Sequence, residues 1–302
     1  MRDVRVEVVI PAFNAAPYIE RALASVYAQQ LRPKRVIVVD DGSLDDTEER
    51  VKSFAATHPD LPMLCIRQTN AGVSAARNRA LQEVDADFVA FLDADDEWEP
   101  LKLARQMKLF IEDVHGRLGL VYCNYSHMDP DSRTLDLEGC VSARVRGAVH
   151  RKLLKGNFIS GSCSAAVLRI EALRQAGGFD ETLVCAEDWD LWLRVAQHWD
   201  VDFVPDVLVR IRQHSSNAQG DSLRMLGGEL RFADKLLAQG GLRYLHLLRL
   251  RARMERLCVG IADFAPWKPS AELSARLQGR WFSFLVCLFT KIRAVVHQWK
   301  RR

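Results

Sequence analysis

The stretch Phe91-Leu92-Asp93-Ala94-Asp95-Asp96 runs an apolar strand directly into three carboxylates. Clustered acids rarely lack a partner in a folded protein, and a hard divalent cation held through oxygen ligands is the usual one. Asp93 and Asp95 lie two positions apart, so extended backbone turns both to one side. One can then hold a ribose hydroxyl while the other reaches a Mg²⁺ or Mn²⁺ that bridges a diphosphate. The alternative is a solvated loop that caps the helix beginning near Pro100.

Upstream of this stretch, short β-branched runs alternate with segments of helical periodicity. This alternation predicts an α/β fold with a mostly parallel sheet, right-handed crossovers and flanking helices. Ligands of such sheets bind beyond the carboxyl ends of the strands, where Asn14, Asp41 and the acidic triplet would converge. The predicted strands are Val4–Ile10, Arg35–Val39, Met63–Ile66 and Asp87–Leu92.

The second strand breaks at the sequence VVDDGS, residues 38–43. Asp41 has two interpretations here: ordinary turn chemistry, or an acceptor-only carboxylate for the imide N–H of a uracil ring. Between the two acidic motifs, NAGVSAARN over residues 70–78 places Gly72 before a helix and Arg77 one turn into it. Arg77 either forms a surface ion pair or lies beside a diphosphate, whose oxygens its fork-shaped guanidinium matches.

A third acidic motif, AEDWDLWLR over residues 186–194, opens a strongly amphipathic helix. Acids in a first turn stabilise a helix through its dipole, by roughly 0.3 to 1 kcal/mol. The functional alternative is that Asp188 acts as a general base toward an attacking hydroxyl, which is typically worth roughly 10² to 10⁴ in rate. Both interpretations stay open on the pattern alone.

The composition suits a globular protein with a sizeable core, since 48% of the 302 residues are hydrophobic and 8% aromatic. A net charge of +3 is too small to indicate a nucleic-acid-binding protein. Seven widely spaced cysteines without a CxxC pair argue against a disulfide framework, and the N-terminus reads as a strand and not as a signal peptide. We therefore expect a cytoplasmic protein.

The patterning changes near Gly220. Residues 1–220 mix strands and helices, whereas residues 221–302 look almost wholly helical. We therefore predict a domain over residues 1–220 and a helical C-terminal region over residues 221–302 that ends in a basic amphipathic tail.

Taken in order, VVIPAFN, VVDDGS, NAGVSAARN, FLDADDEW, GGFDE and AEDWDLWLR resemble the family 2 glycosyltransferases of the GT-A fold. The resemblance covers about Val4 to Val209 and implies an inverting, metal-dependent transfer of a sugar from a nucleotide-sugar, with a UDP-sugar the first choice. The acceptor it implies is a hydroxyl of a saccharide or lipid-linked saccharide in cell-surface polysaccharide or glycan synthesis. The residues it places by the nucleotide are Pro11, Ala12, Asn14, Asp41, Arg77 and Asp93.

The same resemblance makes Asp95 the ligand of Mn²⁺ or Mg²⁺, with Asp96 as the alternative. It makes Asp188 the catalytic base, and places Glu187 beside it to orient the acceptor or the loop. One base and one metal suffice for a single in-line displacement. In some relatives a histidine at the position of His214 approaches the diphosphate or the metal, but we prefer to interpret it as a surface histidine.

The C-terminal tail departs from processive synthases of this family, because it has neither a QxxRW motif nor a transmembrane pair. Residues 281–289, WFSFLVCLF, are too few to span ~30 Å of hydrocarbon as a helix. Two interpretations stay open: a core or homodimer-interface helix, or an in-plane helix with its basic flank on anionic headgroups. The second would place the protein on the cytoplasmic face of a membrane.

Two other functions compete. A sugar-nucleotide nucleotidyltransferase also uses strand-end aspartates with Mg²⁺, but its glycine-rich basic loop is replaced here by PAFNAAPY, residues 11–18. A non-catalytic nucleotide-sugar binding module would bind the nucleotide without turnover. The sequence contains no Walker A run, GxGxxG, HExxH or GxSxG motif, so kinase, dehydrogenase, zinc-protease and α/β-hydrolase functions lack support.

Overall fold

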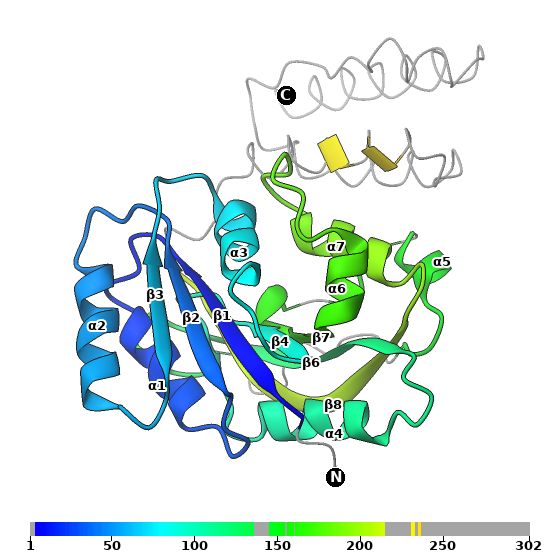
Figure 1. The fold of residues 1–302 in the computed structure, drawn as a ribbon, viewed down its shortest axis with the longest axis horizontal. Helices are drawn as coiled ribbons and strands as arrows, with labels where there is room; N and C mark the ends of the chain where they lie inside the picture. The colour runs from blue at the N-terminus through cyan, green and yellow to red at the C-terminus, as the bar shows by residue number, and fades with distance from the viewer. Residues whose placement is uncertain are drawn as a thin grey trace, which may run out of the picture. The chain divides into compact units, whose positions relative to one another are not determined.

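The computed structural model describes residues 4–135, 145–154, 156–159, 161–214, 231–232 and 235–236 (Figure 1). The chain divides into two units, Met1–Phe232 and Ala233–Arg302. All the strands and helices named below belong to the first unit. The predicted boundary near Gly220 and the basic tail lie outside the described residues, so both stay predictions.

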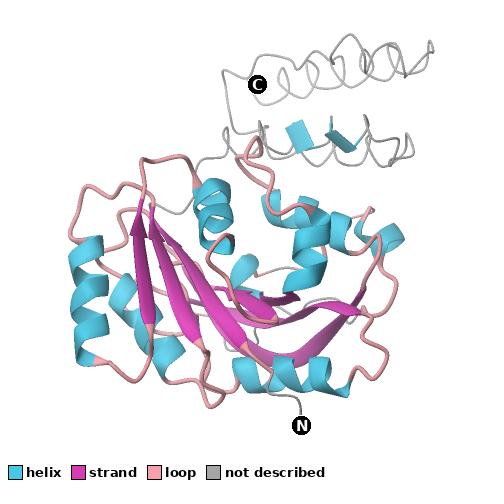
Figure 2. Ribbon diagram, viewed as in Figure 1, coloured by secondary structure: helices cyan, strands magenta, loops and turns pink. Residues whose placement is uncertain are grey.

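The described residues form an eight-stranded sheet in the order β3-β2-β1-β4-β7-β6-β8-β5. Its first half is parallel, as the alternating pattern predicts: β1 pairs with β2 and with β4, and β2 pairs with β3. The arrowheads of β1, β2 and β3 point to the same edge of the sheet (Figure 2). The bounds are β1 Val6–Ala12, β2 Arg35–Asp40, β3 Met63–Arg67 and β4 Phe88–Phe91.

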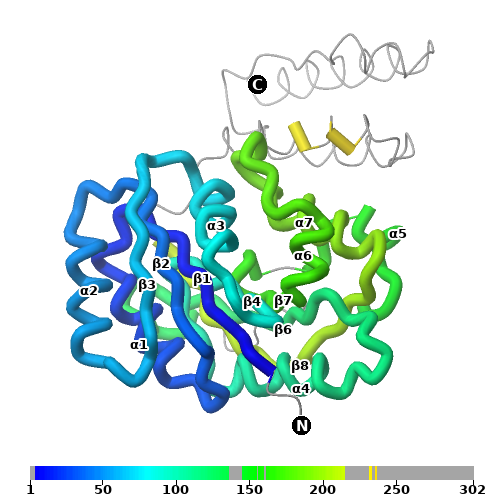
Figure 3. The backbone as a smooth tube through the Cα atoms, in the orientation of Figure 1, coloured from blue at the N-terminus to red at the C-terminus, as the bar shows by residue number. Residues whose placement is uncertain are grey.

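Three helices connect these strands: α1 Ile19–Tyr27, α2 Thr47–Thr57 and α3 Val73–Leu81. In α1 the buried residues Ile19, Leu23 and Val26 recur at the spacing of one helical face, which explains why this segment packs as a helix. Helices α1 and α2 pack on each other, whereas α3 packs against β1 and β2. The tube drawing shows how each helix returns the chain to the starting edge of the sheet (Figure 3).

The second half of the sheet is mixed. β7 runs antiparallel to both β4 and β6, β6 and β8 are parallel, and β5 is antiparallel to β8. These strands are β5 Glu97–Trp98, β6 Leu118–Met128, β7 Ala166–Arg169 and β8 Asp200–Arg212. The helices are α4 Lys102–Glu112, α5 His150–Leu153, α6 Ile170–Ala176 and α7 Glu187–Val195, with a 3₁₀ turn over Cys163–Ala165.

The core of the first unit is built around the central strands, which are buried on both faces. Every residue of β1 and β4 is buried, as expected for strands covered on both faces. Among the described residues, no helix combines the length and apolarity that crossing a bilayer requires.

Candidate active site

Asp41 lies just beyond the end of β2 and is almost fully buried. Its Oδ1 accepts hydrogen bonds from Gln68 Nε2 at 2.7 Å and from the backbone N–H of Ala71 at 2.9 Å. Its Oδ2 accepts from the backbone N–H of Gly72 at 2.8 Å. An ionised carboxylate offers about four lone-pair positions. Asp41 therefore fastens the loop before α3, as turn chemistry would, and keeps one acceptor position for a further N–H.

The residues expected around a nucleotide base do meet at this edge. Ala12 accepts a hydrogen bond from the backbone N–H of Asp41 at 2.8 Å, and Pro11 stands one residue earlier in the same parallel register. Asn14, at φ +49°, donates its backbone N–H to Ser43 Oγ at 2.9 Å. The Asn14 Oδ1 accepts from the backbone N–H of Leu44 at 2.8 Å. Hydrogen bonds between the ends of β1 and β2 thus hold these residues in one place.

The glycine of VVDDGS is required by its surroundings. Gly42 has φ +79°, and a Cβ built there would lie 2.9 Å from the backbone nitrogen of Asn70. A side chain at this position would therefore push the turn away from the loop that Asp41 holds.

Arg77 is buried, so the first of its two interpretations, an ion pair at the surface, is wrong. Its Nη2 lies 2.7 Å from Asp93 Oδ1, and its Nη1 lies 3.0 Å from Glu187 Oε1. The Arg77 side chain is only 3% exposed. One guanidinium thus joins the second acidic motif to the third, over a sequence separation of 110 residues on the Glu187 side. The expected contact of Arg77 with a diphosphate stays a prediction.

Asp188 lies in the first turn of α7, where Ala186 enters the helix in the left-handed region at φ +58°. Its Oδ1 accepts the backbone N–H of Trp189 at 2.6 Å. Burial first, and then the charge of Glu187, raise the pKa of Asp188 to about 7, against the lowering effect of Arg77. A carboxylate with this pKa is suited to accept a proton near neutral pH, which is what a general base requires.

Asp95 faces a histidine that the sequence interpretation placed at the surface. His214 Nε2 lies 2.9 Å from Asp95 Oδ2, and its ring stacks on Tyr18 with 4.8 Å between ring centroids. The His214 side chain is only 10% exposed, so the preference for a surface histidine is wrong. A carboxylate and an imidazole are both donors that Mn²⁺ accepts.

The described residues contain no group of three or more His, Cys, Asp or Glu side chains that could hold a metal ion by themselves. A cation at Asp95 and His214 would therefore need oxygens from its substrate to complete its coordination. This agrees with a Mg²⁺ or Mn²⁺ whose other positions are taken by phosphates.

Asp96, the alternative ligand, has both oxygens occupied. Its Oδ2 accepts from Ser164 Oγ at 2.7 Å, and its Oδ1 accepts from the backbone N–H of Arg212 at 3.1 Å. Burial raises the pKa of Asp96 well above its ordinary range. Ser164 Oγ also accepts the backbone N–H of Asp93 at 3.0 Å. Asp96 is thus a structural support, which leaves Asp95 as the better metal ligand of the two.

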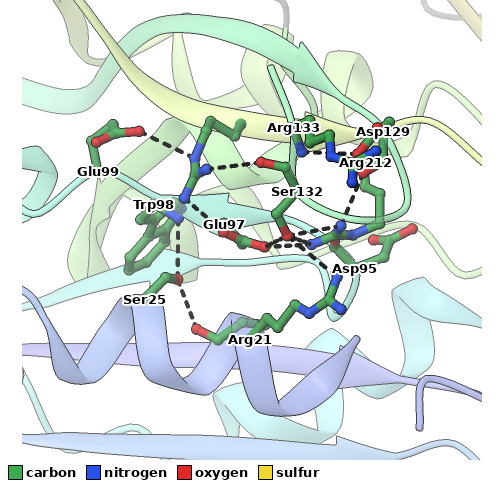
Figure 4. A network of polar contacts seen from close by, with 12 residues as sticks. Arg21, Ser25, Asp95, Glu97, Trp98, Glu99, Asp129, Ser132, Arg133 and Arg212 are labelled. Atoms are coloured by element: carbon green, nitrogen blue, oxygen red, sulfur yellow. Dashed lines mark hydrogen bonds and ion pairs between the residues drawn. The ribbon is translucent and has the colours of Figure 1, made fainter. Parts of the chain in front are cut away.

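Arg212 also holds the acidic loop, and Figure 4 shows its side chain beside Asp95 and Glu97. Its Nε donates to the backbone carbonyl of Asp95 at 2.8 Å, and its guanidinium pairs with Glu97. Arg210 also pairs with Glu97, at 2.6 Å. Arg212 and Ser164 belong to no motif that the sequence pattern singles out. Nothing in the local pattern around Ser164 distinguishes it from any other serine.

Comparison with known proteins gives a family match. Residues 7–177 match the model of glycosyl transferase family 2. The chain is 28% identical over 228 residues to an uncharacterised glycosyltransferase of Rickettsia prowazekii (strain Madrid E), a match that covers 73% of this chain and 68% of the relative.

Two solved structures show the same fold. The first is S. aureus TarS 1–349 in complex with UDP-GlcNAc, with a TM-score of 0.62 and 19% identity, covering 85% of this chain and 73% of that one. The second is the mannosyltransferase PcManGT from Pyrobaculum calidifontis in complex with GDP-Man and Mn²⁺, with a TM-score of 0.61 and 22% identity, covering 99% and 88%. Because the family model matches more than half of the chain, this protein belongs to glycosyl transferase family 2 and is a glycosyltransferase of the GT-A fold.

Proposed function

We propose that the protein transfers a sugar from a nucleotide-sugar to a hydroxyl of a saccharide or lipid-linked saccharide, with inversion at the anomeric carbon. One observation carries the proposal: a single guanidinium, Arg77, binds both Asp93 at the end of β4 and Glu187 beside Asp188. This contact brings the residue expected at the donor's ribose next to the candidate base. A transferase needs a donor-binding residue and a base in one site, whereas a binding module has no use for the base.

The donor would lie at the carboxyl edge of β1, β2 and β4. Pro11, Ala12, Asn14 and Asp41 would surround the base, and Asp93 would hold the ribose. The remaining acceptor position of Asp41 favours a base with an N–H to donate, as in uracil. The structural neighbours were solved with two different nucleotides, and guanine also carries a ring N–H that Asp41 could accept, so a UDP-sugar is the first donor to test and a GDP-sugar the second.

Asp95 and His214 would hold a Mn²⁺ or Mg²⁺ ion. Such an ion, when bound, neutralises charge that develops on a departing nucleoside diphosphate. Asp96, Ser164 and Arg212 would keep Asp95 in place, because their hydrogen bonds fix the loop on both sides of it.

In the transfer step, Asp188 would accept the proton of the acceptor hydroxyl as its oxygen attacks the anomeric carbon. The bond from that oxygen to the carbon forms while the bond from the carbon to the diphosphate oxygen breaks. A single displacement of this kind inverts the anomeric centre and needs no enzyme nucleophile. The pKa of about 7 gives Asp188 a useful charged fraction at neutral pH together with enough basicity to take the proton.

A hydrolysis screen tests the function without knowledge of the acceptor. Many transferases of this kind slowly pass the sugar to water, so a panel of UDP-, GDP- and dTDP-sugars with Mn²⁺ should yield one donor that releases its nucleoside diphosphate. Asp188→Asn should abolish that release while UDP and Mn²⁺ binding, measured by calorimetry, persist. Asp206→Asn, at an exposed aspartate of β8, is the matched control.

Three outcomes contradict the proposal. Collapse of nucleotide affinity in Asp188→Asn would make the residue structural. Tight nucleotide binding without turnover of any donor, even with a panel of saccharide acceptors, would indicate a binding module. Pyrophosphate release from a nucleoside triphosphate and a sugar phosphate would indicate a nucleotidyltransferase.

A further inference from the structure

The middle of helix α3 carries two residues, Arg77 and Asn78, that contact the segment leading into α7 and the first residue of α7. That segment follows α6 and comprises residues 177–186. The contacts of these two residues connect the donor half of the site to the half that carries the base.

Asn78 uses both ends of its side-chain amide. Its Nδ2 donates to the backbone carbonyl of Phe179 at 2.9 Å and to Glu181 Oε1 at 2.8 Å, and its Oδ1 accepts the backbone N–H of Phe179 at 2.9 Å. Gly178, at φ +74°, permits this approach, since a Cβ there would lie 2.8 Å from Asn78 Oδ1. The backbone of the GGFDE segment thus packs closely against one asparagine of the NAGVSAARN motif.

The guanidinium of Arg77 is already paired with two carboxylates. Asp93 and Glu187 each take one terminal nitrogen, and the guanidinium carbon lies 5.2 Å from the ring centroid of Phe179. Its Nε is buried without a hydrogen-bond partner among the described residues. A cation that is nearly enclosed by two carboxylates and an aromatic ring is poorly placed to bind a phosphate group as well. Its geometry is that of a connector.

We propose that Arg77 and Asn78 are positioning residues that set where the start of α7, and hence Asp188, stands relative to Asp93. Asn78 fixes the path of the segment before α7, and Arg77 fixes the first turn of the helix through Glu187. The role of α7 as carrier of the base rests on the proposed function, but the positioning itself does not.

Hydrogen exchange followed by mass spectrometry tests the positioning without any substrate. In Asn78→Ala, peptides covering residues 179–190 should exchange about tenfold faster or more, while peptides of β1 and α1 keep their protection. Arg79→Met is the matched control on the same helix, because the contacts of the Arg79 guanidinium are local ones, a partly exposed ion pair with Glu83 and a hydrogen bond to Gln82. Unchanged exchange over residues 179–190 in Asn78→Ala would overturn the proposal, whatever the enzyme does.

Kinetics with the donor found in the screen separate positioning from phosphate binding. Asn78→Ala should lower kcat about tenfold, with KM for the donor and Kd for UDP within about twofold. Arg77→Met should do the same, and Arg77→Lys should recover part of the loss by keeping the charge. A UDP affinity that falls in Arg77→Met without a change in exchange would make Arg77 a ligand of the diphosphate instead.

The pH profile gives a further readout. The charged or titratable groups facing Asp188 are Glu187, Asp93, Arg77 and Cys163. Arg77 is the one cation among these four, so Arg77→Met should move the acid limb of the rate to higher pH. A limb that stays in place would show that Arg77 does not act on the base. If no donor is turned over by the wild type, the proposed function fails, and the exchange experiment still decides the positioning.

Discussion

Replacing Glu187 by glutamine removes the like charge beside the candidate base Asp188. In the wild type, the pKa of about 7 places half of Asp188 in its charged form at neutral pH. The rate of a reaction that needs the charged form should fall about tenfold for each pH unit below that value, so at pH 5 kcat/KM should be about 100-fold below its plateau.

The size of the shift follows from Coulomb's law. Two carboxylates about 6 Å apart at an effective dielectric constant of about 20 repel by about 3 kcal/mol, and partial solvent exposure reduces this further. Because the charge of Glu187 disfavours the charged form of Asp188, its removal lowers the pKa of Asp188. We therefore expect the acid limb of Glu187→Gln to move down by about one to two pH units.

The assay is the initial rate of donor hydrolysis between pH 5 and 9. Glu171→Gln, at an exposed acid in the first turn of α6, is the matched control and should leave the profile in place. An acid limb near pH 4 in the wild type would show that burial does not act on Asp188 as the structure indicates. A limb that moves to higher pH in Glu187→Gln would refute the reasoning from like charges.

Three other predictions follow from single contacts. Lys102 is buried over the Trp98 ring, and burial lowers its pKa to about 8. Because the unfolded chain binds this proton more tightly than the folded one, burying the charged Lys102 destabilises the fold fully below pH 8. This destabilisation decreases as the pH rises toward 10.5. Lys102→Met should raise the free energy of unfolding at pH 7 by about 2 to 3 kcal/mol in urea, with a smaller gain at pH 10; a loss of stability would contradict this. Asp95→Asn should remove the stimulation of UDP binding by Mn²⁺ in calorimetry, and unchanged stimulation would remove the metal assignment. Gly42→Ala should cost about 1 to 3 kcal/mol of stability and weaken UDP binding, whereas wild-type thermal stability would show that the turn relaxes freely.

Much of the fold could be predicted from the sequence because it depends on local patterns. Buried parallel strands need continuous apolar runs, and the crossovers need amphipathic helices, so the four predicted strands through Leu92 appear as β1 to β4 within two residues at each end. The same patterns predict where the site lies, since parallel strands bring their carboxyl ends to one edge. The residue types at those ends, such as Asp41 and Asp95, then indicate a nucleotide and a cation.

The partners of those residues were decided only by the tertiary structure. Arg77 meets Glu187 across 110 positions, and Arg212 holds Asp96 across 116. The Arg212 contact depends on the order of strands in the sheet, in which β8 lies beside β6 and β5, whereas the Arg77 contact joins helix α3 to helix α7. His214 is largely shielded from solvent because β8 continues to Arg212 and places His214 beside Asp95. The burial of a side chain and its charged partners depend on chain segments that are distant in sequence. The residues next to it in the sequence carry no information about those segments, so no local pattern could predict these contacts.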